Sequence, residues 1–128
     1  SLVKDGDPGA LKALGFRKPD KLRCSITTDK SKLALGEAIE LTATIESESK
    51  RSQALIVDYV VHYVRKNGVV SEKVFKWKNI EMPAGDVLKL KKKQSFKQTT
   101  VRVLYPGTHQ VDLQINGERV ASTSVKLT

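Results

Sequence analysis

The chain carries few side chains able to build a catalytic centre or bind a metal ion. It has one cysteine, Cys24, and two histidines, His62 and His109. A nucleophilic triad needs a Ser or Cys beside a base and an orienting group, and zinc sites need several Cys or His ligands. The sequence also lacks a glycine-rich phosphate loop. We therefore expect no catalytic residue, no metal site and no cofactor, and interpret the chain as not an enzyme in its own right.

Cys24 and His62, the residues most capable of chemistry, each have a structural explanation. Cys24 alternates with Leu22 and Ile26, which is typical of a buried structural thiol. His62 shares a strand face with Asp58, but four residues along an extended strand is too far for direct contact. We expect His62 to bond a cross-strand neighbour, with a ligand-contact role as the alternative.

Positive charge is concentrated in the middle of the chain. Eleven of the 23 Lys and Arg residues, but only three of the 14 acidic residues, lie between Arg65 and Arg102, and the net charge is +9. A basic patch indicates a polyanion binder, whereas Lys also keeps a solvated face soluble or protects sheet edges. Trp77 lies among these cations, and we expect it to pack in the core, with a stacking platform as the alternative. The candidate backbone contacts are Arg65, Lys66, Lys73, Lys76, Lys78, Lys91 and Lys93.

The spacing of apolar residues predicts an all-β fold. Alternation over 22–27 and 39–45 predicts half-buried strands, and the run 54–64, apolar on both sides, predicts a central strand. Asn67-Gly68 and Asn116-Gly117 predict tight hairpins. With a further strand over 99–104, the pattern indicates an immunoglobulin-like β-sandwich of seven or eight antiparallel strands. Consecutive residues Lys91 to Lys93 cannot all face one way in a strand.

The first twenty residues read differently from the rest. Asp7 suits a helix N-cap, Pro8 the first helical position and Gly15 the end, which predicts a short N-terminal helix over 7–16. We expect 17–20 to be a connector and 21–128 to be the sandwich. The chain has no apolar run near the ~20 residues that cross a bilayer. With a single cysteine, which excludes an internal disulfide, this favours a cytoplasmic protein with no membrane contact.

Three segments carry a resemblance to a known family. VDYVVHYVRKNGVVSEKVFKW (Val57 to Trp77), the later lysine-rich strand and LYPGTHQVDLQING (Leu104 to Gly117) resemble the C-terminal immunoglobulin-like domain of AlkC-type DNA alkylation-repair glycosylases. The leader PGALKALGF resembles the segment that joins this domain to HEAT-like helical repeats.

The resemblance implies an accessory domain that contacts double-stranded DNA beside a catalytic helical-repeat domain. Residues 1–20 would then be the linker and short helix from that upstream module. Because the repeats that hold the alkylated base are not in this sequence, no catalytic residue is carried over. The alternative is a protein-interaction or inter-domain packing sandwich, docked through its two-sided apolar strand, with no direct nucleic-acid contact.

Overall fold

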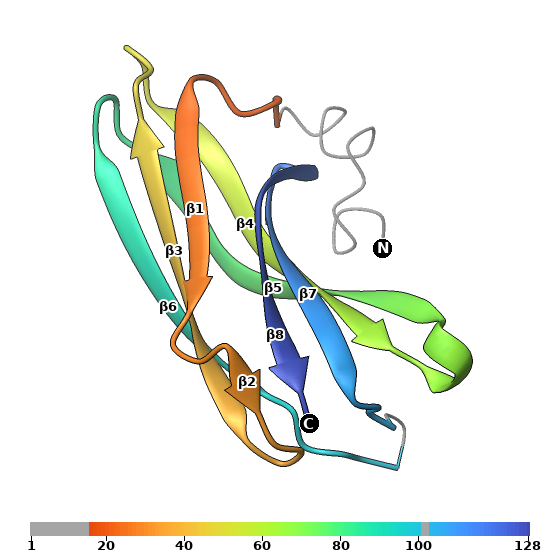
Figure 1. Ribbon diagram of the computed structural model, residues 1–128. Coiled ribbons are helices and arrows are strands. Elements are labelled where there is room, and N and C mark those ends of the chain that lie inside the picture. Colours follow the sequence, from red (N-terminus) through yellow and green to blue (C-terminus); the bar gives the residue numbers. More distant parts are fainter. Residues whose placement is uncertain (1–15, 101–102) are drawn as a thin grey trace.

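The computed structural model describes residues 16–100 and 103–128, which form two β-sheets packed face to face (Figure 1). One sheet has the strand order β1-β3-β6 and the other β2-β8-β7-β4-β5. The strands are β1 (Leu22–Thr28), β2 (Lys32–Leu33), β3 (Ala38–Ser47), β4 (Gln53–Val64), β5 (Val70–Met82), β6 (Val87–Ser95), β7 (Gly107–Ile115) and β8 (Glu118–Leu127). The predicted immunoglobulin-like sandwich is confirmed, and β4 is central, between β7 and β5.

Alternating side chains of both sheets fill the space between them. Leu41 and Ile45 of β3 face Val57 and Val61 of β4, and all four are fully buried. Such packing excludes water from apolar surface, which is the main driving force for folding. The Tyr59 hydroxyl donates a 2.5 Å hydrogen bond to Gln94 Oε1 on β6, so a buried polar contact also joins the sheets.

Two predicted features of strand pairing are wrong. The expected strand over 99–104 is not formed by its described residues, since Thr99 makes an isolated bridge and Leu104 is irregular. Leu104 is nevertheless buried, because the chain passes from one sheet to the other between β6 and β7 and buries this apolar side chain on the way. Pairing is also not antiparallel throughout, because β2 pairs with β8 in parallel. The chain changes sheets at this point, because β2 follows β1 in the sequence but lies in the opposite sheet.

Both Asn-Gly pairs lie in hairpin loops, as predicted. Asn116 and Gly117 have φ of 49° and 81°, the left-handed conformation that a type I′ turn requires, and Ile115 pairs directly with Glu118. Asn67 and Gly68 also have positive φ, 66° and 76°. Their loop is longer than predicted, however, and contains the 3-10 turn η1 (Lys66–Gly68).

The predicted N-terminal helix lies outside the described residues, except for its last position. That residue, Phe16, and the connector up to Asp20 have no regular secondary structure. Over the ranges 16–100 and 103–128, we find no helix with the length and apolar character needed to cross a membrane.

Two side-chain amides hold the connector against the sandwich. Asn116 Nδ2 donates to the Arg17 carbonyl at 2.7 Å and to Ala54 O at 3.0 Å, while its Oδ1 accepts from Ile56 N at 2.7 Å. Gln53 Oε1 accepts from Asp20 N at 3.0 Å, and its Nε2 donates to Asp20 O at 2.8 Å. Three backbone groups of a segment without strand pairing are thereby hydrogen-bonded, which holds the segment against the sandwich.

We expect Gln53→Ala to free the Asp20 amide. One hydrogen bond contributes about 1 kcal/mol, so amide exchange at Asp20 should accelerate roughly five-fold. Hydrogen–deuterium exchange measured by NMR checks this, with Gln98→Ala as the control because Gln98 bonds Leu104 O instead. Unchanged protection of Asp20 would show that the Gln53 amide does not hold the connector.

Candidate nucleic-acid interface

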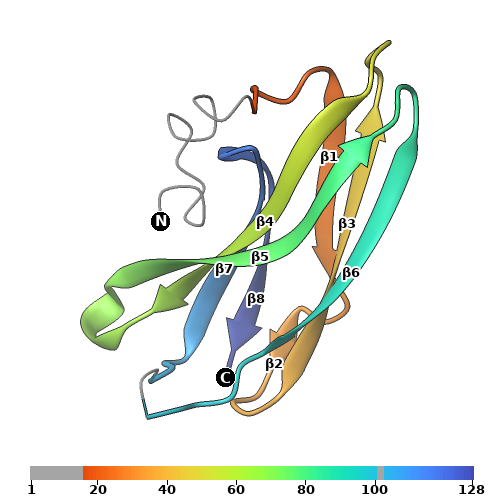
Figure 2. The same cartoon turned by 180° about the vertical axis from the view of Figure 1, so that it is seen from behind.

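The basic strands β5 and β6 are the edge strands of their two sheets and lie on the same side of the sandwich. Figure 2 shows the C-terminal half of β5 leading toward β6, and β1 of the same sheet as β6 packs instead against β8. Because side chains of paired residues point to the same face, strand register tells which way each lysine projects.

A β-bulge redistributes the charges of β5. The register with β4 shifts between Val57 and Asp58, so that Lys78 pairs with Val57 but Lys76 pairs with Asp58. Lys73 pairs with Val61. Since Val57 and Val61 belong to the core, Lys73 and Lys78 lie on the inward side of the edge strand and remain exposed there. Lys76 lies on the outer face.

The three consecutive lysines of β6 divide between the two sides, as predicted. Lys91 and Lys93 pair with Thr42 and Glu40 on the outer face, and Lys91 Nζ lies 3.3 Å from Glu40 Oε1. Lys92 pairs with core residue Leu41 and is an exposed residue of the inward side, like the lysines of β5 just described.

The seven predicted contacts therefore do not share one face. Arg65 and Lys66 lie at the end of the β4–β5 hairpin, which projects beyond the other sheet (Figure 1). The other five lie on the inward edge of β5, on the outer face of its sheet, and on the outer face of β6. Sequence reasoning missed Lys92, although strict alternation with Lys91 and Lys93 separates it from them.

Aromatic rings lie among the inward-side lysines. Phe75 stacks on Tyr59 with ring centroids 5.0 Å apart and planes 9° apart, and Lys73 Nζ lies 5.5 Å from the Phe75 centroid. Trp77 meets Tyr59 edge-on at 5.4 Å. The prediction that Trp77 packs on the core is confirmed, but the side chain is only partly buried.

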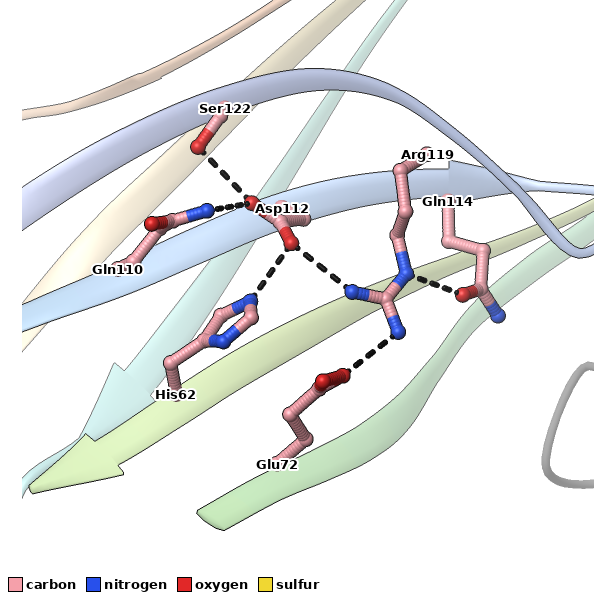
Figure 3. Close-up of polar contacts among 7 residues, drawn as sticks. All are labelled: His62, Glu72, Gln110, Asp112, Gln114, Arg119 and Ser122. Carbon is pink, nitrogen blue, oxygen red and sulfur yellow. Dashed lines mark hydrogen bonds and ion pairs between the residues drawn. The ribbon is translucent and has the colours of Figure 1, made fainter. Parts of the chain in front are cut away.

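The outer face of the five-stranded sheet carries a network centred on Asp112 (Figure 3). His62 Nε2 lies 2.6 Å from Asp112 Oδ2, which confirms the expected cross-strand partner. Arg119 donates to Asp112 at 3.0 Å and to Glu72 at 2.8 Å. Burial alone would raise the pKa of Asp112, but hydrogen bonds from Gln110, His62 and Ser122 and the charge of His62 lower it to about 2. This part of the outer face is an ion-pair network rather than a cationic surface.

Burial also shifts the pKa of two other side chains, Asp58 and Cys24. Burial raises the pKa of Asp58 to about 6, although the nearby Gln114 side chain and the charge of Lys76 oppose the shift. Burial also raises the pKa of Cys24 to about 11, so the thiol is protonated and unreactive near neutral pH. Cys24 is packed against the core but only half-buried, less than predicted.

A hollow of about 320 Å³ lies at the end of the sandwich where the connector enters. Its lining mixes cations with carboxylates, since Arg17, Lys18 and Arg51 are accompanied by Asp20 and Glu81. Arg51 Nε lies 4.0 Å from Asp20 Oδ2. Across the described ranges, no three His, Cys, Asp or Glu side chains are grouped to hold a metal ion.

Comparison with known proteins identifies the relatives of this fold. Residues 23–128 match the family model "Uncharacterised protein YhaZ, C-terminal Ig-like domain". The uncharacterized protein YhaZ of Bacillus subtilis (strain 168) is 30% identical over 119 residues, covering 92% of this chain and 33% of the relative.

A solved structure is also similar over nearly the whole chain. The alkylpurine DNA glycosylase AlkC of Pseudomonas fluorescens, bound to DNA containing an abasic site analog, superposes with a TM-score of 0.91 at 34% identity. The match covers 99% of this chain and 36% of that one, so the chain spans about a third of these relatives. A β-glucosidase from Listeria innocua shares only the fold, at 16% identity and a TM-score of 0.66. The match covers 88% of this chain and 17% of the β-glucosidase chain.

Asp58 should make the stability of the sandwich depend on pH. Its folded pKa of about 6 lies above the ordinary 3.8, so its contribution is fully present below pH 3.8 and is lost as the pH rises through 6. We expect Asp58→Asn to raise the free energy of unfolding at pH 7.5 by up to about 3 kcal/mol, at about 1.4 kcal/mol per pKa unit.

Urea denaturation of both proteins at pH 4 and pH 7.5 measures this effect. At pH 4 the buried carboxyl is protonated in the folded protein, so the gain should nearly vanish. An equal effect of the substitution at the two pH values would exclude charge burial as its cause.

Proposed function

Because the chain belongs to the family of YhaZ C-terminal Ig-like domains, we propose that it is a DNA-binding accessory domain of a DNA alkylation-repair protein. It grips the phosphate backbone and has no catalytic role. The glycosylase activity, the double-stranded DNA and the upstream HEAT-like repeat domain belong to the parent protein in this proposal. Support comes from the likeness to AlkC, whose structure is bound to DNA.

The observation that carries the proposal is a set of lysines on the two edge strands β5 and β6 that have no acidic partner among the described residues. In the described parts of the chain, ion pairs engage Lys91 and Arg119 but not Lys73, Lys78 or Lys92. Such lysines keep their full charge for phosphates, whose neutralisation releases counterions and favours binding. Arg65, Lys66 and Lys93 are further backbone contacts, whereas Lys76 beside Asp58 and Lys91 beside Glu40 are partly neutralised.

The alternative of a docking sandwich loses its main support. It relied on the outer side of β4 as an uncovered apolar surface. Ile56, Asp58 and Val60 on that side are only 8%, 1% and 0% exposed, so they offer little surface to a partner. The polar network around Asp112 occupies the neighbouring strand.

Binding to duplex DNA should be strongly salt-dependent. The logarithm of the binding constant falls against the logarithm of salt concentration with a slope of roughly 0.9 per phosphate contact. We expect Lys73→Gln and Lys78→Gln each to flatten this slope by about one unit, measured by fluorescence anisotropy of a labelled duplex.

Lys30→Gln is the matched control, because Lys30 already lies 4.0 Å from Glu37 and bonds Ala38 O. It should leave the slope unchanged. Absence of duplex binding even at low salt, or binding that is independent of salt, would refute a backbone-gripping function.

A further inference from the structure

The edge between β5 and β6 combines lysines that form no ion pair with any described residue and an aromatic surface that is partly exposed. We call it the rim and define it by Lys73, Phe75, Trp77, Lys78 and Lys92. Lys73, Phe75 and Lys78 face inward through the register with β4, and Lys92 through the register with β3. Trp77 lies at the bulge and contacts the inward-facing Tyr59. The Tyr59–Gln94 hydrogen bond links the β5 part of the rim to the β6 part. Phe75 of β5 stacks on Tyr59, and Gln94 of β6 lies two residues after Lys92 on the same face.

The bulge in β5 gives the rim its composition. In regular alternation, Trp77 and Lys78 would point to opposite faces. With the register shift, Lys78 pairs with core residue Val57 while Trp77 contacts Tyr59, so both lie toward the inward side. Bulges commonly redirect a side chain in this way at binding sites.

Backbone gripping alone requires no aromatic ring. A duplex offers phosphates and sugars on its surface, whereas the faces of its bases are stacked inside. Proteins that bind single strands pair a positively charged groove with aromatic side chains on which unstacked bases lie. The outer face of β6 offers lysines as well, but there Glu40 lies beside Lys91 and Lys93 and aromatic residues are absent from the described register.

We infer that the rim binds a DNA strand with unstacked bases, with phosphates on Lys73, Lys78 and Lys92 and a base against Trp77. This inference rests on the proposed DNA-binding function and specifies which form of DNA the rim takes. An unpaired or distorted stretch of a duplex supplies such a strand as well as a free single strand does.

The tryptophan is a built-in probe, because Trp77 is the only one in the chain. The 128-residue chain is titrated with an oligothymidylate of about twelve nucleotides, a span that suits one small domain. Trp77 emission should change with the same midpoint as anisotropy, and quenching by neutral acrylamide should fall as the base covers the indole. A perfectly paired duplex should bind with little change in Trp77 emission.

Adjacent lysines on β6 provide matched variants. Lys92→Gln should weaken oligothymidylate binding several-fold and flatten its salt slope by about one unit, whereas Lys93→Gln, on the opposite side, should change both less. Trp77→Leu should weaken binding roughly ten-fold or more through lost stacking. Circular dichroism checks that this variant folds, and the wild-type fluorescence titration does not depend on it.

Binding of the oligothymidylate with unchanged Trp77 emission, or equal effects of the two lysine variants, would overturn the inference but leave DNA binding intact. Failure to bind any DNA at low salt would instead refute the proposed function, and the inference with it.

Discussion

The pairing of β4 with β5 determines where the charge of this molecule is presented. Each residue of β5 except Trp77, which lies at the bulge, has a partner on β4 that indicates its face, and the register shifts once, between Val57 and Asp58. Without the shift, alternation would place Lys78 on the same side as Lys76, where Asp58 already lies. The bulge thus separates Lys76, which pairs across the strands with a buried carboxyl group, from Lys78, which lies on the other side of the strand.

Two acids on the outer face of the five-stranded sheet solve the problem of buried charge differently. Asp112 is surrounded by donors, and its depressed pKa shows that the ionised form is the stable one. Asp58 has fewer donors, and burial instead favours its neutral form. Because these groups are held by other residues of the sheet, the acids of this face do not reach the lysines of the rim.

Much of the fold could be predicted from the sequence because two-residue periodicity and Asn-Gly turns are local signals. The central position of β4 and the cross-strand partner of His62 followed from the same reasoning. The strand over 99–104 was mispredicted because Leu104 is buried without being paired. The basic face was harder, since charge counts along a sequence do not show which lysines meet across two sheets. The bulge and the partner of Lys92 depend on pairings between distant segments.

Lysines on β5 and β6 have a second role that does not compete with binding. Both are edge strands, and charged side chains on an edge discourage pairing with another sheet. Edge protection alone would be served equally well by lysines on either side of the strand. It gives no reason for Lys73 and Lys78 to lie on either side of the partly buried Phe75 and Trp77, where no ion pair engages them within residues 16–100 and 103–128. Leaving aromatic surface uncovered costs hydrophobic stabilisation, and a nucleic-acid strand that covers it recovers that cost on binding.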